Sequence, residues 1–411
     1  MNPYAILIPL LLLGAALLDI VADWLNMRHA SREPPCTLAD IYDKDRYRTS
    51  QSYLREHTCQ GIFESGLMVI LTVGFILTGG LHLVDDWARS LNLGAIGTGL
   101  VFVATLGLIT FLAGLPFAIR TTFSIEARFG FNHTTVATFI LDRIKVVALA
   151  LIIGGPILAL VFWTFLFLGT TAWLFAWIAL TCIQLFLLFI TPVVIMPLFN
   201  KFIPLPAGDL RSAIEAYASA NAVKIKDVYT MDGSKRSGKS NAFFAGFGRF
   251  RRIVLFDTLI NNHSTDELLA VLAHETGHYK LGHLPWMLAT SVAQSGLMLF
   301  LMSQFMFNRD LALAFQMNSP SVHAGLIGFG ILYTPIGLLL GIVNNAVSRR
   351  HEYAADEFAR RTTGTAEHLI NALKKLSRDN LSNLTPHPLK VVLSYSHPPL
   401  KDRIAALIAN R

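Results

Sequence analysis

The chain has 411 residues, of which 53% are hydrophobic and only 15% are charged, and its formal net charge is +7. Soluble domains carry about 25% charged residues, so this composition excludes an ordinary soluble protein and predicts an integral membrane protein. No basic–aromatic recognition motif accompanies the positive charge. We therefore expect the partner of the basic residues to be the lipid bilayer and not nucleic acid.

Seven apolar runs reach the roughly 20 residues that a helix needs to cross hydrocarbon. They predict transmembrane helices at about 4–22, 65–84, 95–118, 146–168, 172–197, 284–307 and 322–346. The fourth and fifth can also be drawn as a longer hairpin. The first run does not resemble a cleavable signal peptide, because its first basic residue, Arg28, follows the apolar segment.

Basic residues in short loops predict the orientation of the chain, because such loops stay on the cytoplasmic side. The loops within 23–64 and 119–145 contain ten lysines and arginines, whereas the loops of opposite parity contain only Arg89 and Arg309. The ten are Arg28, Arg32, Lys44, Arg46, Arg48, Arg55, Arg120, Arg128, Arg143 and Lys145. We expect an external N-terminus, with the polar segments 198–283 and 347–411 on the cytoplasmic side.

The three cysteines do not have the spacing of a metal site. Cys36 and Cys59 fall in a loop predicted to be cytoplasmic, where thiols stay reduced, and Cys182 lies within a span. A Cys36–Cys59 disulfide remains open only for the inverted topology. No CxxC pair is present, so sulfur ligation of a metal is not favoured.

The polar segments predict one α+β unit that two membrane helices interrupt. Residues 208–222 have helical spacing, residues 224–232 alternate like a strand, and a hairpin is expected from strands near 240–244 and 251–257. A helix follows, starting near Ser264 or Thr265. The predicted organisation is 1–197 with spans one to five, 198–283 as an α+β segment, 284–346 with spans six and seven, and 347–411 as a helical segment.

The helix after the hairpin carries His-Glu-x-x-His at residues 274–278. Residues four apart share one helix face, so His274 and His278 can bind one ion, while Glu275 reaches the open coordination position beside them. A catalytic zinc takes three protein ligands and one water. A neighbouring carboxylate then accepts the proton of that water as it attacks a carbonyl. The motif therefore predicts a hydrolytic zinc site.

The third ligand must come from elsewhere in the chain. His283 lies one residue short of the extended pattern of metzincins, where Leu284 stands instead, so we interpret it as a polar residue at the membrane boundary. Glu352 and Asp356 form an E-x-x-x-D pair just after the seventh span, and two successive spans return the chain to the face that holds His278. Glu352 is therefore the expected ligand, although an exposed acidic helix face has the same pattern. Asp356 suits a carboxylate that orients a ligating histidine.

The combination of "HETGHYKLGH" before one span and "NNAVSRRHEYAADEFA" after the next resembles the CAAX prenyl protease type 1 family of integral-membrane zinc endopeptidases. Shorter heat-shock membrane proteases share the zinc motif but have fewer spans. Further segments similar to the family are "IEARFGFNHTTVATFILDRIK", "PVVIMPLFNKFIPLPAGDL", "KSNAFFAGF", "RRIVLFDTLI" and "YSHPPLKDRI".

The resemblance implies a seven-span helical membrane protein with a gluzincin-type α+β zinc domain split by the last two spans. It implies one Zn²⁺ per chain on His274, His278 and Glu352, with Glu275 as general base and Asp356 behind the ligands.

The resemblance also implies roles for residues around the metal. His397 of "SHPP" is expected to contact the substrate carbonyl or the developing oxyanion, although a helix cap is the alternative. Asn241 and Ala242 are expected at the centre of an edge strand that pairs with an extended peptide, or else in an ordinary hairpin. Arg403 either pairs with an acidic residue near the zinc or is a solvated helix charge.

The chain lacks a long insertion before the seventh span and ends in "ALIANR", without an endoplasmic-reticulum retention signal. These departures predict a bacterial-type member in the inner membrane; a eukaryotic member is expected in the endoplasmic-reticulum membrane. The main functional hypothesis is an endopeptidase that cleaves lipidated, prenylated CAAX-type or membrane-associated peptides near their C-terminus. Alternatives are a broad-specificity quality-control protease and a seven-span receptor or transporter with a structural metal site.

Overall fold

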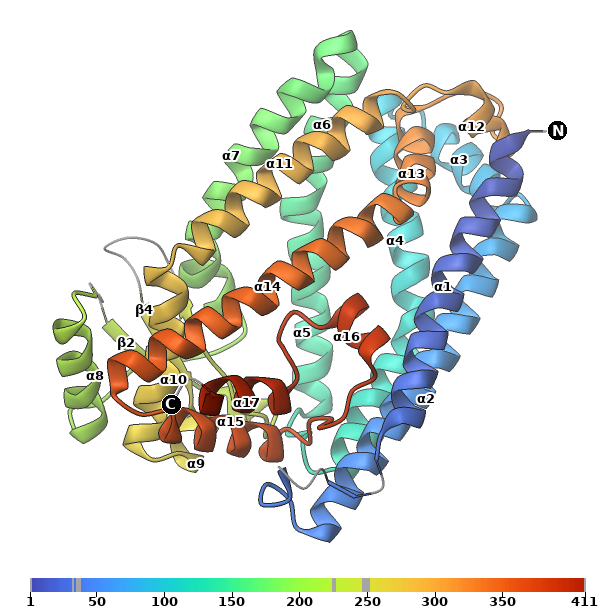
Figure 1. Ribbon diagram of the computed structural model, residues 1–411. Helices are drawn as coiled ribbons and strands as arrows, with labels where there is room; N and C mark the ends of the chain where they lie inside the picture. Colours follow the sequence, from blue (N-terminus) through green and yellow to red (C-terminus); the bar gives the residue numbers. More distant parts are fainter. Residues whose placement is uncertain (1, 32, 35–37, 224–226, 246–251, 410–411) are drawn as a thin grey trace.

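Long apolar helices form most of the protein. A computed structural model describes residues 2–409, except for 32, 35–37, 224–226 and 246–251. In this part of the chain, six helical segments are long and apolar enough to cross a membrane, and a bent pair of helices makes a seventh if it counts as one span. Figure 1 shows these helices along most of the length of the molecule. The structure confirms a mostly helical, polytopic membrane protein.

The spanning segments are α1 (Pro3–His29), α2 (Lys44–Leu77), α4 (Gly94–Arg120) with a π-helical turn Thr121–Glu126, α5 (Val136–Leu149) joined by a π-helical turn to α6 (Gly155–Phe167), α7 (Ala172–Ile190) with short turns on both sides, α11 (His283–Ser303), and the bent pair α13 (Val322–Leu332) and α14 (Thr334–Thr363).

Two spans end or bend where the sequence did not predict it, and the fourth begins at Val136 and not near residue 146. The second was expected to reach residue 84, but α2 ends at Leu77, because Gly79 takes a left-handed conformation with φ 79° and α3 (Gly80–Ser90) leaves in another direction. The seventh is bent by 52° between α13 and α14. Pro335 in the first turn of α14 lacks an N–H and crowds the carbonyl four residues earlier, which accounts for the bend.

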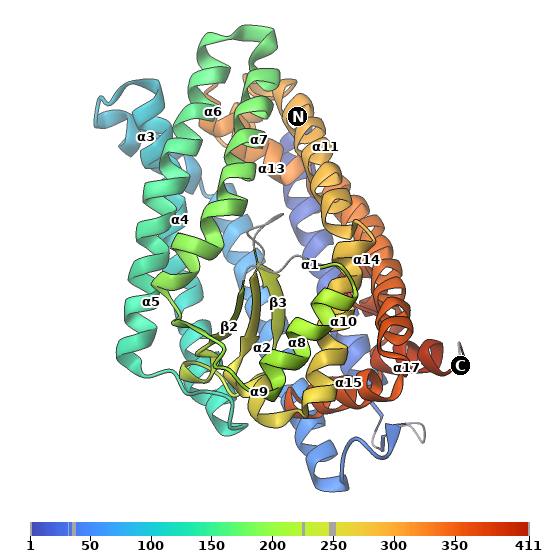
Figure 2. The same ribbon diagram turned by 90° about the vertical axis from the view of Figure 1, so that its left-hand side faces the viewer.

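A four-stranded sheet lies at one end of the helices. Its order is β1-β2-β4-β3, with β2 and β4 parallel and the other two pairs antiparallel. The strands are β1 (Phe202–Pro204), β2 (Asp227–Met231), β3 (Ala242–Ala245) and β4 (Arg252–Phe256). The predicted hairpin is confirmed, since β3 pairs with β4, and β3 forms one edge of the sheet. Figure 2 shows the sheet beside α10, with α8 and α9 nearby.

The remaining helices are α8 (Asp209–Ala220), α9 (Asp257–Asn262), α10 (Thr265–Lys280), α12 (Arg309–Ala314), α15 (Glu367–Asp379), α16 (Pro388–Ser394) and α17 (Leu400–Ala409). One hydrophobic core joins the sheet to helices from both sides of the α11–α14 insertion. It includes the buried Ile214 of α8, Leu255 of β4, Leu272 of α10, Leu369 of α15 and Leu407 of α17. The C-terminal helices therefore pack back onto the segment that contains the sheet.

The described cysteines lie on the membrane helices. Cys59 of α2 and Cys182 of α7 are free and exposed, and Cys59 Sγ is 3.8 Å from Met27 Sδ of α1. Cys36 lies outside the described residues, and so does the disulfide that it could form.

Candidate metal centre

Helices α10 and α14 carry the candidate metal ligands and pack closely together. Helix α10 begins where the sequence predicts: Ser264 is its N-cap, and a capping box with Glu267 satisfies two backbone N–H groups. Where the helices meet, a Cβ on Gly277 would lie only 3.0 Å from Ala355 Cα. A side chain larger than hydrogen would crowd this approach, so the glycine favours the close packing that brings the polar side chains of the two helices together.

The potential ligand atoms of three side chains converge between these helices. His274 Nε2 lies 3.1 Å from His278 Nε2 and 3.4 Å from Glu352 Oε2. His278 Nε2 lies 3.2 Å from Glu352 Oε1. Zinc–nitrogen distances of about 2.0–2.1 Å place tetrahedral ligand atoms about 3.3 Å apart. The spacing of the three side chains therefore fits a single zinc-sized ion.

The burial of these groups supports the same conclusion. Glu352 is only 4% exposed and His274 only 7%. Glu352 Oε2 is buried and accepts no hydrogen bond in the described part of the chain, and its nearest cation is the Arg403 guanidinium, with Nη1 3.3 Å away. A bound metal ion would further offset the cost of burying this carboxylate. Among the described residues, His274, His278 and Glu352 form a group that could hold a metal ion.

A buried Asp–Arg pair lies next to this group. Asp356 Oδ1 is 2.8 Å from His274 Nδ1, and Arg403 donates to both oxygens of Asp356 over 2.8 and 2.6 Å. Since Nδ1 of His274 faces a carboxylate, it carries the ring proton, and the lone pair of Nε2 points toward the other ligands. Arg403 is 8% exposed, so it is a buried partner and not a solvated helix charge.

The local charges shift the pKa values of these groups. Burial lowers the pKa of His274, but the carboxylates of Asp356 and Glu352 outweigh burial and raise it to about 9. Burial also lowers the pKa of Arg403, whereas its hydrogen bonds to Asp356 raise it, with a net increase. The imidazole of His274 is thus made more basic, as suits a strong metal ligand.

Glu275 is half-buried on α10, between the two histidines in sequence. Burial raises the pKa of its carboxyl, and the neighbouring imidazoles of His274 and His278 lower it by less. A carboxylate with a raised pKa is a better proton acceptor near neutral pH. The environment of Glu275 therefore suits a general base.

His397 lies at the exposed side of the group. Its side chain is 65% exposed, and its Nε2 is 3.4 Å from Glu352 Oε1. Its Nδ1 is within hydrogen-bond distance of Ser396 Oγ, at 2.9 Å. An imidazole at this position combines access to solvent with proximity to the candidate ligands.

The predicted substrate-binding residues lie at the start of β3. Asn241 precedes the strand and is exposed, and Ala242 is its first residue and pairs with Leu255 of β4. Asn241 O accepts a hydrogen bond from Phe256 N. The two residues therefore lie at one end of the edge strand, whereas the sequence predicted them at its centre.

His283 makes a contact with the metal centre that its sequence position did not predict. His283 Nδ1 lies 3.0 Å from His278 Nδ1, and its ring stacks on that of His351 at 3.9 Å with an interplanar angle of 7°. Gly282, with φ 72°, turns the chain between α10 and α11 and brings His283 back to His278. The signal in the sequence was a glycine directly before a histidine at the end of the motif helix.

A polytopic helical membrane protein with a His-His-Glu group between two packed helices has the architecture of an integral-membrane metalloprotease. The family model described as "CAAX prenyl protease N-terminal, five membrane helices" matches residues 23–201, and the model of peptidase family M48 matches residues 204–410. Together the two models cover nearly the whole chain.

Individual relatives agree with the family models. The CAAX prenyl protease 1 homolog of rice is 39% identical over 75% of this chain and 72% of its own length. CAAX prenyl protease 1 of Saccharomyces cerevisiae is 35% identical over 83% of this chain and 76% of its own length. The crystal structure of S. mikatae Ste24p superposes with a TM-score of 0.94 at 31% identity, over 99% of both chains.

The chain therefore belongs to the CAAX prenyl protease 1 family of M48 peptidases, and it is a membrane metalloprotease. The expectation of a bacterial-type member is not supported, because the relatives described above come from a plant and from yeasts.

Proposed function

We propose that this metalloprotease holds one zinc ion on His274, His278 and Glu352 and cleaves a peptide bond near the C-terminus of a lipidated or membrane-associated substrate. The observation that carries the proposal is the convergence of His274 Nε2, His278 Nε2 and the Glu352 carboxylate, whose closest atoms are 3.1, 3.2 and 3.4 Å apart. These separations match the ligand spacing of a tetrahedral zinc site, about 3.3 Å.

Zinc bound there would supply a water with a pKa of about 7 and would polarise the scissile carbonyl. Glu275 accepts the proton of the attacking water on its carboxylate and then donates that proton to the departing amine. Asp356 holds the Nδ1 proton of His274, and Arg403 holds Asp356 in place with two hydrogen bonds.

Two further groups position the substrate. His397 donates a hydrogen bond from Nε2 to the carbonyl oxygen, where negative charge develops during attack. The free edge of β3 pairs with the extended substrate backbone, starting beside Asn241 and Ala242. The exposure of His397 and the edge position of β3 support these roles, since both groups must reach an incoming peptide.

The proposed substrate is a prenylated CAAX-type peptide. The relatives are named CAAX prenyl proteases, and a lipid anchor explains why the catalytic group lies at the end of membrane helices. The anchor stays in or beside hydrocarbon while the scissile bond meets water. A quality-control protease would instead accept membrane proteins without a lipid.

We propose seven spans, with the bent pair α13–α14 counted as one, an external N-terminus and the metal centre at the cytoplasmic face. The domain organisation proposed is 1–197, 198–283, 284–346 and 347–411. The ratio of ten basic residues to two between the loops of opposite parity supports this orientation. In a eukaryotic cell the expected location is the endoplasmic-reticulum membrane.

The test is cleavage of a farnesylated CAAX peptide and of its unlipidated twin by the full-length protein in detergent. Wild type and Glu275→Gln are compared, and the zinc content of both is measured. We expect one zinc per chain in both proteins, cleavage by the wild type alone, and preference for the farnesylated peptide. Equal cleavage of the two peptides would favour the quality-control function, and equal cleavage by the two proteins would reject Glu275 as the base.

A further inference from the structure

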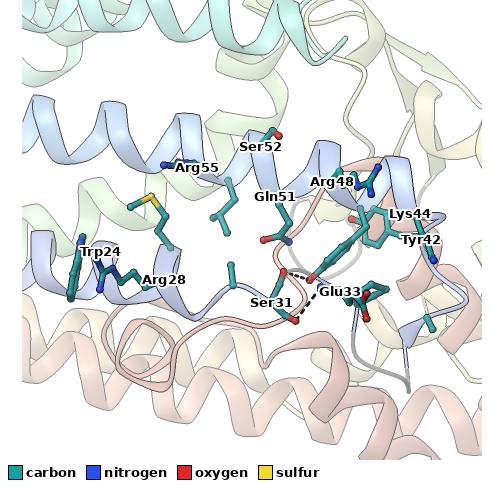
Figure 3. A pocket seen from close by; sticks show the side chains of 16 residues that line it. Trp24, Arg28, Ser31, Glu33, Tyr42, Lys44, Arg48, Gln51, Ser52 and Arg55 are labelled. Atoms are coloured by element: carbon teal, nitrogen blue, oxygen red, sulfur yellow. Dashed lines mark hydrogen bonds between the residues drawn. The ribbon is translucent and has the colours of Figure 1, made fainter.

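A large pocket opens between α1 and α2, and none of its lining residues is a candidate metal ligand. It has a volume of about 1490 Å³ and is lined by the last turns of α1, by described residues between α1 and α2, and by the first half of α2. Figure 3 shows the side chains that line it. Figure 1 places the α1–α2 connection at the end of the molecule that also contains α15 and α17. The pocket therefore lies toward the membrane face that carries the metal centre.

One wall of the pocket is a polar stripe on α2. Lys44, Arg48, Gln51 and Arg55 all line the pocket and follow one another at intervals of four, three and four residues. That spacing places them on one face of the helix. Arg28 of α1 contributes a further cation from the opposite wall. Four cationic side chains thus face a single pocket.

Little negative charge on the protein balances these cations. In the described part of the chain, Arg28, Lys44 and Arg55 have no carboxylate within ion-pair distance. Arg48 pairs only with Asp45, and that pair is highly exposed, with side chains 76% and 92% accessible. Such exposed pairs contribute little.

The pocket is also lined by an acid and by uncharged polar side chains. Glu33 is the acidic residue among the described lining residues. The Tyr47 hydroxyl donates to Ser31 O and so is already satisfied. Gln51 Nε2 is buried without a hydrogen-bond partner. An unsatisfied donor beside four cations suits an anion with several acceptor oxygens.

The position along the helices relates the pocket to the bilayer surface. The apolar run of α1 gives way to Trp24, over whose ring the Arg28 guanidinium lies at 4.4 Å. Tryptophan and arginine at the end of a span mark the headgroup layer. Along α2, Arg55 lies eleven residues closer to the apolar part of the helix than Lys44 does, or about 16 Å at 1.5 Å per residue. The stripe therefore runs from the headgroup layer into water.

We propose that this pocket binds the headgroup of an anionic phospholipid. A phosphate of the headgroup would lie between Arg28 and Arg55, and the acyl chains would extend along the apolar part of α1. Further acidic groups of the headgroup would reach Arg48 and Lys44. A lipid fits better than a soluble anion because the cations continue an apolar helix surface at the depth of the headgroups.

The test compares Arg48→Gln/Arg55→Gln with wild type by native mass spectrometry of the full-length protein in neutral detergent. Phosphatidylinositol 4-phosphate, phosphatidylserine and phosphatidylcholine are titrated separately. Wild type should bind the two anionic lipids more tightly than phosphatidylcholine. Loss of two cations should weaken anionic-lipid binding by roughly thirtyfold, at about fivefold for each cation.

The matched control is Arg120→Gln/Arg309→Gln, which removes two exposed cations outside the pocket and should bind as wild type does. All substituted residues are exposed, and the thermal unfolding midpoint checks that each variant is folded. Equal lipid binding by the pocket variant and the control would overturn the proposal. So would equal affinity for soluble inositol phosphate, which would assign the pocket to a free anion, or displacement of lipid by an acidic peptide.

Discussion

Two groups of histidine, aspartate and arginine, each with a buried histidine and a buried aspartate, lie toward opposite ends of the membrane helices (Figure 1). In the group of α3 and α13, His323 Nε2 is 2.7 Å from Asp85 Oδ1, and Arg89 Nε donates to Asp85 Oδ2 over 2.9 Å. Asp85 and His323 are only 2% and 3% exposed. Both oxygens of the aspartate are satisfied within this group.

The group of the metal centre has nearly the same internal geometry. His274 Nδ1 is 2.8 Å from Asp356 Oδ1, and Arg403 Nε donates to Asp356 Oδ2 over 2.8 Å. The two groups differ in the ring nitrogen that contacts the aspartate. His274 contacts Asp356 through Nδ1, so its Nε2 faces His278 and Glu352. His323 contacts Asp85 through Nε2. A His–Asp–Arg group alone therefore does not distinguish the metal centre; the converging ligand atoms of His278 and Glu352 do.

The largest effect is expected from Glu352→Gln. An amide in place of the carboxylate removes the negative ligand, so we expect loss of bound zinc and a decrease in cleavage of at least about a thousandfold. Zinc content by atomic emission and the rate of peptide cleavage measure both. Retention of one zinc per chain by this variant would contradict the assigned ligand set.

The next effect is expected from Asp356→Asn. The variant keeps the shape of the side chain but weakens its hold on the His274 Nδ1 proton, and zinc affinity should fall about 10–100-fold. Competition with a zinc chelator gives the affinity. If the affinity equals that of the wild type, Asp356 is only a partner of Arg403.

A smaller effect is expected from His283→Ala, which removes the group that faces His278 Nδ1 at 3.0 Å. We expect zinc affinity to fall about tenfold, with kcat reduced and KM unchanged. His283→Gln keeps an acceptor and should recover part of the affinity. Equal values for the alanine and glutamine variants would show that His283 acts by packing against His351 alone.

The smallest effect on the metal centre is expected from Asp85→Asn. Zinc affinity and kcat should match wild type, because this group lies near the other end of the helices. Stability should fall by about 2 kcal/mol, because the charge-assisted hydrogen bonds to His323 and Arg89 are weakened. Thermal unfolding in detergent measures the change. A loss of zinc would show that the two groups are coupled.

Much of the fold followed from local patterns. Apolar runs predicted the helical spans, and alternation predicted the β3–β4 hairpin, because span length and strand period depend on consecutive residues. Glu352 was expected near His278 from the return of the chain across two spans, and the structure places their side-chain atoms 3.2 Å apart. The bend before Pro335 was missed, since proline is also tolerated in the first turn of a straight helix.

Within the site, the sequence by itself determined the spacing of His274, Glu275 and His278 on one helix face. The tertiary structure decided which groups meet them. Gly277 sets how closely α14 approaches, and Gly282 turns His283 back toward His278. The burial of Arg403 against Asp356 depends on α17 packing onto α14. Helical periodicity acts over a few residues, whereas contacts between distant segments depend on how whole helices pack.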